Sequence, residues 1–69
     1  MQEKIYINGE IENLSSRSIK LLLEKRGINW SKGGIAIARN GQVVPRTDWE
    51  QKFLKANDKI EIVHIVRGG

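Results

Sequence analysis

The chain has 69 residues, no Cys and one His, and its 12 Lys and Arg against 8 Asp and Glu give a formal net charge of +4. This length predicts one domain with a small core, and the missing thiols exclude a disulfide framework and a zinc site of Cys and His ligands. The first residues are polar and no apolar run approaches the length of a membrane span, so we expect a soluble cytoplasmic protein.

The first predicted element is a hairpin. Residues 4–8 alternate apolar and polar side chains, which is the period of a β-strand. Asn8-Gly9 follows, and this pair is typical of a type I′ turn because both of its central residues need a positive φ. Residues 10–14 are then the returning strand.

A helix is predicted over residues 18–26. Ser15, Ser16 and Ser18 are all candidate N-caps, and Gly27 is the residue expected just after the C-terminal end. A helical spacing of apolar residues gives this segment one buried face, made of Ile19, Leu22 and Leu23. Residues 28–34 are predicted to form a loop.

A second hairpin is predicted from residue 35 onward. Residues 35–39 form its first strand, Asn40-Gly41 its turn, and residues 42–44 its short partner. Pro45 has no N–H for a ladder, so this strand ends there or lies at a sheet edge.

The segment after Pro45 predicts a short turn that closes the core. Residues 47–51 form one helical turn capped by Thr47, and Trp49 fills the space beneath that turn as a hydrophobic plug. Phe53 and Leu54 then enter the core.

Residues 59–66 are predicted as the last strand, after a turn at residues 56–58 in which Asn57 adopts a positive φ. This strand is apolar on both faces, which is typical of a central strand covered from both sides. His64 is expected to be packed or half-packed. One face carries Ile60, Ile62 and Val66, and the other carries Val63 and Ile65.

The order of elements, ββαββ followed by a final β, predicts an α+β domain with a mixed five-stranded sheet and one main helix. The last strand lies between the two hairpins and parallel to the first. Residues 1–66 form the domain, and residues 67–69 form a flexible Arg-Gly-Gly tail. The predicted shared core consists of Ile5, Ile7, Leu22, Phe53, Leu54 and Ile62.

The end of the sequence is the strongest candidate site. Gly68 and Gly69 follow a core strand almost directly, which would project a free α-carboxylate from a rigid body. A Gly-Gly segment also fits a narrow enzyme channel because no side chain leaves its backbone. A frayed terminus is the alternative interpretation.

Other candidate motifs are better explained by structure. Gly33-Gly34 is not followed by the Lys and Ser or Thr of a phosphate-binding loop. Asp58 and Glu61 do not form a pair of the glycosidase kind. The basic residues are scattered, and a nucleic-acid-binding stripe would need aromatic partners that the spacing does not group. We therefore expect no nucleic-acid partner.

The sequence resembles the ThiS family of thiamine-pathway sulfur carriers, which have the ubiquitin-like β-grasp fold. The resemblance covers nearly the whole chain. Asn57 stands where the family usually has Gly, and Asn also tolerates the positive φ of that turn. The matching residues are 7–10, 18–22, 36–46 with Trp49, and 57–66 ahead of Gly68-Gly69.

The resemblance implies chemistry performed on this protein by partner enzymes. A ThiF-type adenylating enzyme would activate the Gly69 carboxylate with ATP and Mg²⁺, and a persulfide donor followed by reduction would leave a thiocarboxylate. A ThiG-type thiazole synthase would then receive the sulfur. Gly68 and Arg67 would thread the partner active sites, and Val63, His64 and Ile65 would form docking surface. The carrier itself would be a monomer with no bound metal or cofactor.

Two related functions share the same ending and stay open at this point. One is a ubiquitin-like modifier joined to target proteins through Gly69, and the other is a sulfur carrier of the molybdopterin type. Arg67 precedes Gly-Gly where the ThiS family often has a small residue, so it bears on which partner is preferred.

Overall fold

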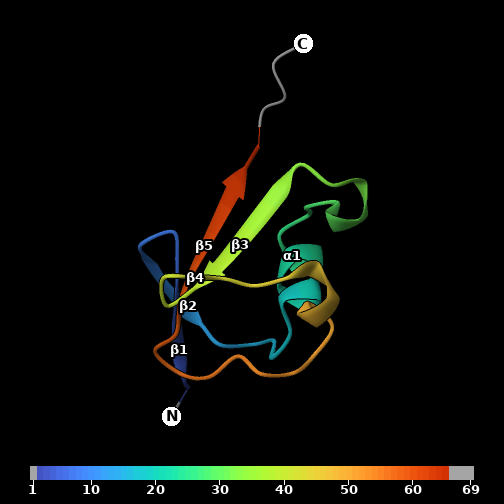
Figure 1. Ribbon diagram of the computed structural model, residues 1–69. Coiled ribbons are helices and arrows are strands. Elements are labelled where there is room, and N and C mark those ends of the chain that lie inside the picture. The colour runs from blue at the N-terminus through green and yellow to red at the C-terminus, as the bar shows by residue number, and fades with distance from the viewer. Residues whose placement is uncertain (1, 66–69) are drawn as a thin grey trace.

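The computed structural model describes residues 2–65, which form a sheet with one α-helix packed against it (Figure 1). The helix is α1 (Ile19–Lys25), and two single 3-10 turns, η1 (Trp30–Lys32) and η2 (Arg46–Asp48), lie in the connections. None of the helices in this part of the chain has the length and apolar character needed to cross a membrane. The strands are β1 (Lys4–Ile7), β2 (Glu10–Asn13), β3 (Ile35–Arg39), β4 (Gln42–Val43) and β5 (Lys59–His64).

The strand order in the sheet is β2-β1-β5-β3-β4. β5 runs parallel to β1 and antiparallel to β3, and both hairpin pairs are antiparallel. The helix α1 lies against one face of this sheet (Figure 1). The predicted mixed five-stranded sheet with one main helix, a ubiquitin-like β-grasp fold, is therefore confirmed, with the last strand between the two hairpins.

Both hairpin turns have the backbone that their sequences predict. Asn8 and Gly9 have φ angles of 51° and 84°, and Asn40 and Gly41 have 53° and 86°. Two successive positive φ angles define the type I′ turn, whose twist matches that of the flanking strands. Asn57 also has a positive φ, 70°, as expected for the turn that precedes β5.

The helix α1 begins and ends where its capping residues predict. The Ser18 hydroxyl accepts a hydrogen bond from the Leu21 N–H at 3.2 Å, which satisfies one of the free amides of the first turn. Gly27 follows the helix with a φ of 74°. The helix buries the predicted face of Ile19, Leu22 and Leu23.

The core lies between α1 and the sheet and is closed at one end by Trp49. Trp49 is 1% exposed, and its indole N–H donates to the Val44 carbonyl at 3.0 Å, so the predicted plug is confirmed. Of the predicted core residues, Phe53 is only half-buried at its edge. The buried apolar residues are Ile5, Ile7, Ile19, Leu22, Leu23, Ile35, Ile37, Val44, Trp49, Leu54, Ile60 and Ile62.

Two connections differ from the prediction. The turn after the second hairpin is the 3-10 helix η2, with Pro45 at its N-cap position and no capping hydrogen bond from a side chain, so the Thr47 cap was wrong. Pro45 has a φ of −60°, which suits the start of a helical turn and moves that start ahead of Thr47. The predicted loop at residues 28–34 contains the turn η1, where the Asn29 side chain accepts from the Ser31 N–H.

The faces of β5 also differ from the prediction. Ile60 and Ile62 are buried under α1, but Val63 and Ile65 on the opposite face are each 53% exposed. Within residues 2–65 no second layer covers that face, so the expectation of a strand covered from both sides was wrong. Strand β5 ends at His64, and Val66 lies outside the described residues.

Candidate functional site

The tail residues predicted to carry the chemistry, Arg67, Gly68 and Gly69, lie outside the described residues. The structure describes the residues that precede them, at the end of β5, and the sheet face beside that end.

The end of β5 is fixed on the side of β3. The two strands pair from Ile35–His64 to Arg39–Ile60, and the Ile65 N–H donates to the Gly34 carbonyl at 2.7 Å just beyond the strand. Gly34 has a φ of 77°, which favours glycine, and a Cβ there would lie 3.7 Å from the Ile65 carbonyl oxygen. Gly34 thus continues the β3–β5 ladder to Ile65.

On its other side, β5 is held by the side chain of Asn8. The Oδ1 atom of Asn8 accepts from the Ile62 N–H at 2.7 Å, and Nδ2 donates to the Ile62 carbonyl at 3.4 Å. The Asn8 N–H donates to the Ile60 carbonyl at 2.8 Å. The side-chain amide of Asn8 therefore continues the hydrogen bonding between β1 and β5 as far as Ile62, beyond the residue where β1 ends.

The predicted docking residues do not all share one face. Val63 and Ile65 lie on the face opposite α1, and both are exposed. His64 pairs with Ile35 and therefore lies on the helix side, yet it is exposed, so the packed or half-packed histidine was wrong. His64 is the last residue of the strand, at the end of the sheet, which explains its exposure.

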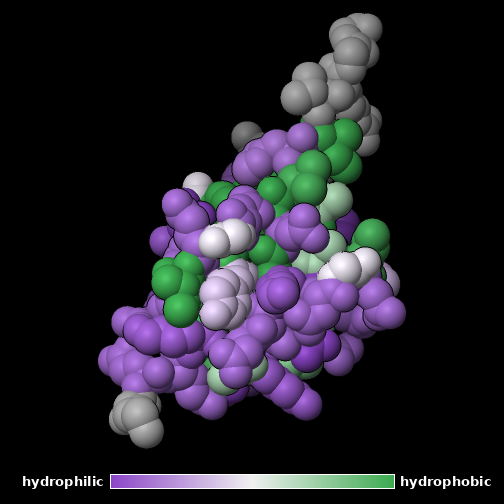
Figure 2. Space-filling model, turned by 90° about the vertical axis from the view of Figure 1, so that its left-hand side faces the viewer, coloured by the Kyte–Doolittle hydropathy of each residue, from purple (hydrophilic) through white to green (hydrophobic). Residues whose placement is uncertain are grey.

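The free sheet face carries further apolar side chains that the sequence reasoning did not assign to it. Val43 is 77% exposed and Ile11 is 59% exposed. The pairings Ala38–Val43 and Ala38–Glu61 place Val43 on the same face as Val63. Figure 2 shows hydrophobic side chains gathered on this face toward its upper end, among polar ones. The period-two alternation of the strands was the signal that could have identified them.

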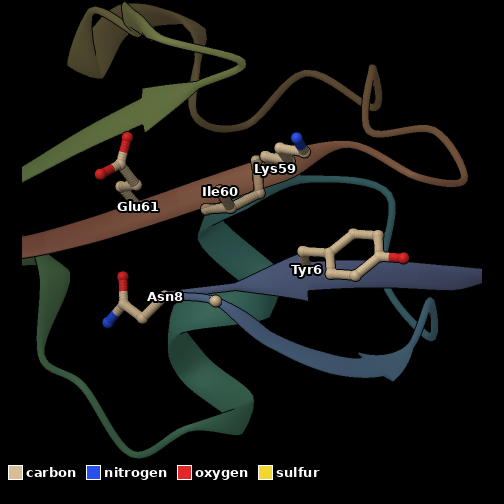
Figure 3. Close-up of a pocket in the computed structure, with 6 residues that line it drawn as sticks. Tyr6, Asn8, Lys59, Ile60 and Glu61 are labelled. Atoms are coloured by element: carbon tan, nitrogen blue, oxygen red, sulfur yellow. The ribbon is translucent and has the colours of Figure 1, made fainter.

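A groove of about 620 Å³ lies on this face beside the Asn8-Gly9 turn. Figure 3 shows Tyr6 and Asn8 from the β1 side and Lys59 and Glu61 from β5 around it. Its lining mixes an aromatic ring with one positive and one negative side chain. Such a surface suits contact with a polypeptide better than capture of a small ion of one charge. This groove was not predicted from the sequence.

The most strongly hydrogen-bonded carboxylate of the described region is that of Asp58, at the entry to β5. Its oxygens accept from Arg39 Nε at 2.7 Å, from the Lys55 N–H at 2.9 Å and from Asn40 Nδ2 at 3.1 Å. Burial alone raises the pKa of Asp58, but these hydrogen bonds outweigh it, and the pKa lies below its ordinary value of 3.8. Asp58 therefore links the turn before β5 to the end of β3 and the Asn40-Gly41 turn through hydrogen bonds, and it is ionised at neutral pH.

Three features of the described residues bear on metal and nucleic-acid binding. Residues 2–65 contain no cluster of three or more His, Asp or Glu side chains that could hold a metal ion. Trp49 is buried, and Lys20 lies 5.4 Å from the ring centre of Trp30, so these rings already have intramolecular partners. Four of the basic residues form ion pairs with carboxylates, namely Arg17, Lys20, Arg26 and Arg39.

Comparison with known proteins gives consistent matches over nearly the whole chain. The model of the ThiS family matches residues 5–69. The sulfur carrier protein ThiS of Escherichia coli is 31% identical over 55 residues, which is 80% of this chain and 80% of that protein. The crystal structure of the thiamine biosynthesis protein ThiS from Geobacter metallireducens has the same fold, with a TM-score of 0.78 at 20% identity over 96% of this chain and 99% of that one.

Two further relatives are much longer proteins. The thiazole synthases of Paramagnetospirillum magneticum and Magnetococcus marinus are 37% and 34% identical to this chain, each over 67 residues. Each match covers 96% of this chain, whereas this chain spans only 20% of the length of either synthase.

Proposed function

This chain belongs to the ThiS family, and we propose that it is a sulfur carrier of thiamine biosynthesis whose reacting group is the α-carboxylate of Gly69. The observation that carries the proposal is the position of β5. It is the central strand of the sheet, it is hydrogen-bonded up to Ile65, and only Val66 and Arg67 separate that residue from Gly68-Gly69 in the sequence.

The proposed chemistry takes place on the carrier in three steps. A carboxylate is a poor electrophile at neutral pH because it is ionised. Its oxygen attacks the α-phosphate of ATP in an adenylating enzyme of the ThiF type, which forms the acyl adenylate and releases pyrophosphate. A persulfide sulfur of the donor then attacks the acyl carbon and displaces AMP, and reduction of the resulting S–S bond by a thiol leaves the Gly69 thiocarboxylate.

In this proposal the carrier supplies position and the partners supply catalysis. Gly68 and Gly69 enter the partner active sites because they add no side-chain bulk, and Arg67 precedes them. The thiocarboxylate sulfur is the nucleophile delivered to a thiazole synthase. The two relatives that are thiazole synthases support that choice of acceptor.

The proposed docking surface is the apolar end of the free sheet face. Val63 and Ile65 are its centre, because both are half-exposed and both precede the tail. His64, on the other face at the same end, would contact a partner that encloses the strand end. Exposed apolar residues of this kind mark interaction sites when they cluster, and here they cluster beside the proposed reacting end.

The proposal is tested by intact mass. The chain is incubated with a ThiF-type adenylating enzyme, ATP, Mg²⁺, a persulfide donor and a thiol, and its intact mass is then measured by mass spectrometry. The expected product is heavier by the difference between sulfur and oxygen. A matched variant that lacks Gly69 leaves residues 2–65 unchanged and should gain no sulfur. If the parent chain gains no mass under conditions that convert Escherichia coli ThiS, the proposal is wrong.

A further inference from the structure

The strand β5 is longer than the β1 strand beside it. The pairing of the two strands covers only Tyr6–Lys59 and Ile7–Ile60, and the Asn8 amide adds contacts to Ile62. Beyond that point β1 has turned into the Asn8-Gly9 hairpin. Figure 1 shows β5 continuing upward past this hairpin.

The hydrogen-bond pattern shows which backbone groups of β5 face this open side. Lys59 and Ile65 bond across to β3, since the Lys59 carbonyl accepts from Asn40 and the Ile65 N–H donates to Gly34. Antiparallel ladders bond at every second residue, so the even-numbered residues of β5 point the other way. The Ile60 carbonyl and both backbone groups of Ile62 do so, toward Asn8. The N–H and carbonyl of His64 point the same way, and no residue of 2–65 bonds them.

This open edge differs from the two outer edges of the sheet. Unpaired edges are usually protected by charged side chains, proline or a covering segment, because they attract other strands. The outer strand β2 carries Glu10 and Glu12, and the outer strand β4 is followed closely by Pro45. The residues past the contact with Asn8 are Val63 and His64 of β5 and Ile65 just after it, with neither proline nor an acidic or lysine side chain among them.

We propose that an extended segment of a thiazole synthase adds to this edge of β5 as a further strand, bonded to the backbone of His64. This inference rests on the proposed function, which supplies the partner. Strand addition takes its affinity from main-chain hydrogen bonds and its selectivity from alternate side chains. The added strand would lie beside the exposed Val63 and Ile65, whose apolar side chains offer contact on the free face. It would hold the partner against the residues that lead directly to Gly69.

The experiment uses the whole 69-residue chain, made by chemical synthesis with one backbone N-methyl group. An N-methyl group on His64 removes the edge donor and fills the path of an added strand, yet it leaves the β3 ladder intact. The matched control is an N-methyl group on Ile11. Leu14 and Glu3 form a hydrogen-bonded pair, so the alternation of the hairpin places the Ile11 N–H on the outer edge of β2.

Binding to a purified thiazole synthase that works with a separate carrier is then measured. The His64 modification should weaken binding at least about 10-fold, since it removes a hydrogen bond and adds a clash. The Ile11 modification should change it less than about 2-fold. Equal binding by the parent and the His64-modified chain would overturn the proposal, as would loss of binding by both modified chains alike.

Amide hydrogen exchange of the unmodified chain gives a second test that needs no variant. The His64 N–H should exchange rapidly in the free chain and become protected in the complex, whereas the Ile65 N–H should be protected in both. An unchanged His64 rate in a formed complex overturns the proposal. Protection that rises with concentration of the free chain would assign the edge to a second copy and also overturn it. A chain that gains sulfur but binds no synthase would refute this inference and leave the carrier chemistry standing.

Discussion

Replacing Asn8 with alanine should destabilise the end of β5, and the resulting loss in the free energy of unfolding has two parts. The first part is the loss of the Asn8 bonds to Ile62, of which the one at 2.7 Å is strong and the one at 3.4 Å is weak. Such a pair contributes about 0.5–1.5 kcal/mol net. The second part is the φ of 51°, which costs an alanine roughly 1 kcal/mol or more. Asn8→Ala should therefore lower the free energy of unfolding by about 2 kcal/mol.

Asn57 provides a matched control for the backbone part. It also has a positive φ, 70°, but its side chain makes no hydrogen bond to any described residue. Asn57→Ala therefore measures the conformational penalty alone. The difference between the Asn8 and Asn57 variants estimates the bonds to Ile62. For a domain of this size, about 1 kcal/mol corresponds to a shift in Tm of roughly 4–8 °C.

Urea denaturation of the two variants gives the free energies, and amide exchange of Ile62 locates the effect. Asn8→Ala should speed exchange of the Ile62 N–H, while Asn57→Ala should leave it near the parental rate. The reasoning is refuted if Asn8→Ala loses no more stability than Asn57→Ala and the Ile62 exchange rate does not change.

Three further changes test the core, the charge network and the docking surface. Leu22→Ala, at a buried position of α1, should cost roughly 2–5 kcal/mol in denaturant unfolding, whereas Leu21→Ala, at an exposed one, should stay within about ±0.5 kcal/mol. Folding lowers the pKa of Asp58, so its ionised carboxylate contributes to stability above pH 3.8, and this contribution is lost as the pH falls through the pKa of the folded state. Asp58→Asn should therefore make the free energy of unfolding less dependent on pH in this acidic range. An unchanged dependence on pH would contradict this. Val63→Glu should weaken binding to the synthase at least about 5-fold, equivalent to about 1 kcal/mol. The control Ile11→Glu changes an exposed residue of an outer strand and should not weaken binding. Equal effects of the two changes would place the docking surface elsewhere.

Much of the fold could be predicted because its local signals agree with one another. The two Asn-Gly turns, the Ser18 cap and Gly27 each require a particular backbone conformation, and the structure has that conformation at each. The side chain of Asn8 shows where such reasoning stops. The turn type follows from its sequence, but its bonds to Ile62 depend on how β1 and β5 are placed side by side, which no local pattern contains.

The faces of β5 could not be predicted for a similar reason. Apolar residues alternate onto both faces, and this pattern is the same whether the second face meets another layer of the same chain or a partner. The exposure of Val63 and Ile65 follows from the single helix, which covers one face. The turn η2 begins earlier than predicted because the φ of Pro45 already suits a helical start, whereas the Thr47 hydroxyl makes no capping hydrogen bond. The turn η1 had a readable signal in the Asn29 cap.

The central claim is that the carbonyl carbon of Gly69 is the reacting centre, and one added residue tests it most directly. An alanine after Gly69 leaves residues 2–65 and the net charge unchanged but moves the terminal carboxylate by about 3.5 Å along an extended chain. A misplacement of about 1 Å can already slow a positioned reaction about 100-fold. The rate of thiocarboxylate formation, followed by intact mass, should therefore fall at least about 100-fold relative to the parent. Conversion of the extended chain at the parental rate, with the added alanine still present, would contradict the account.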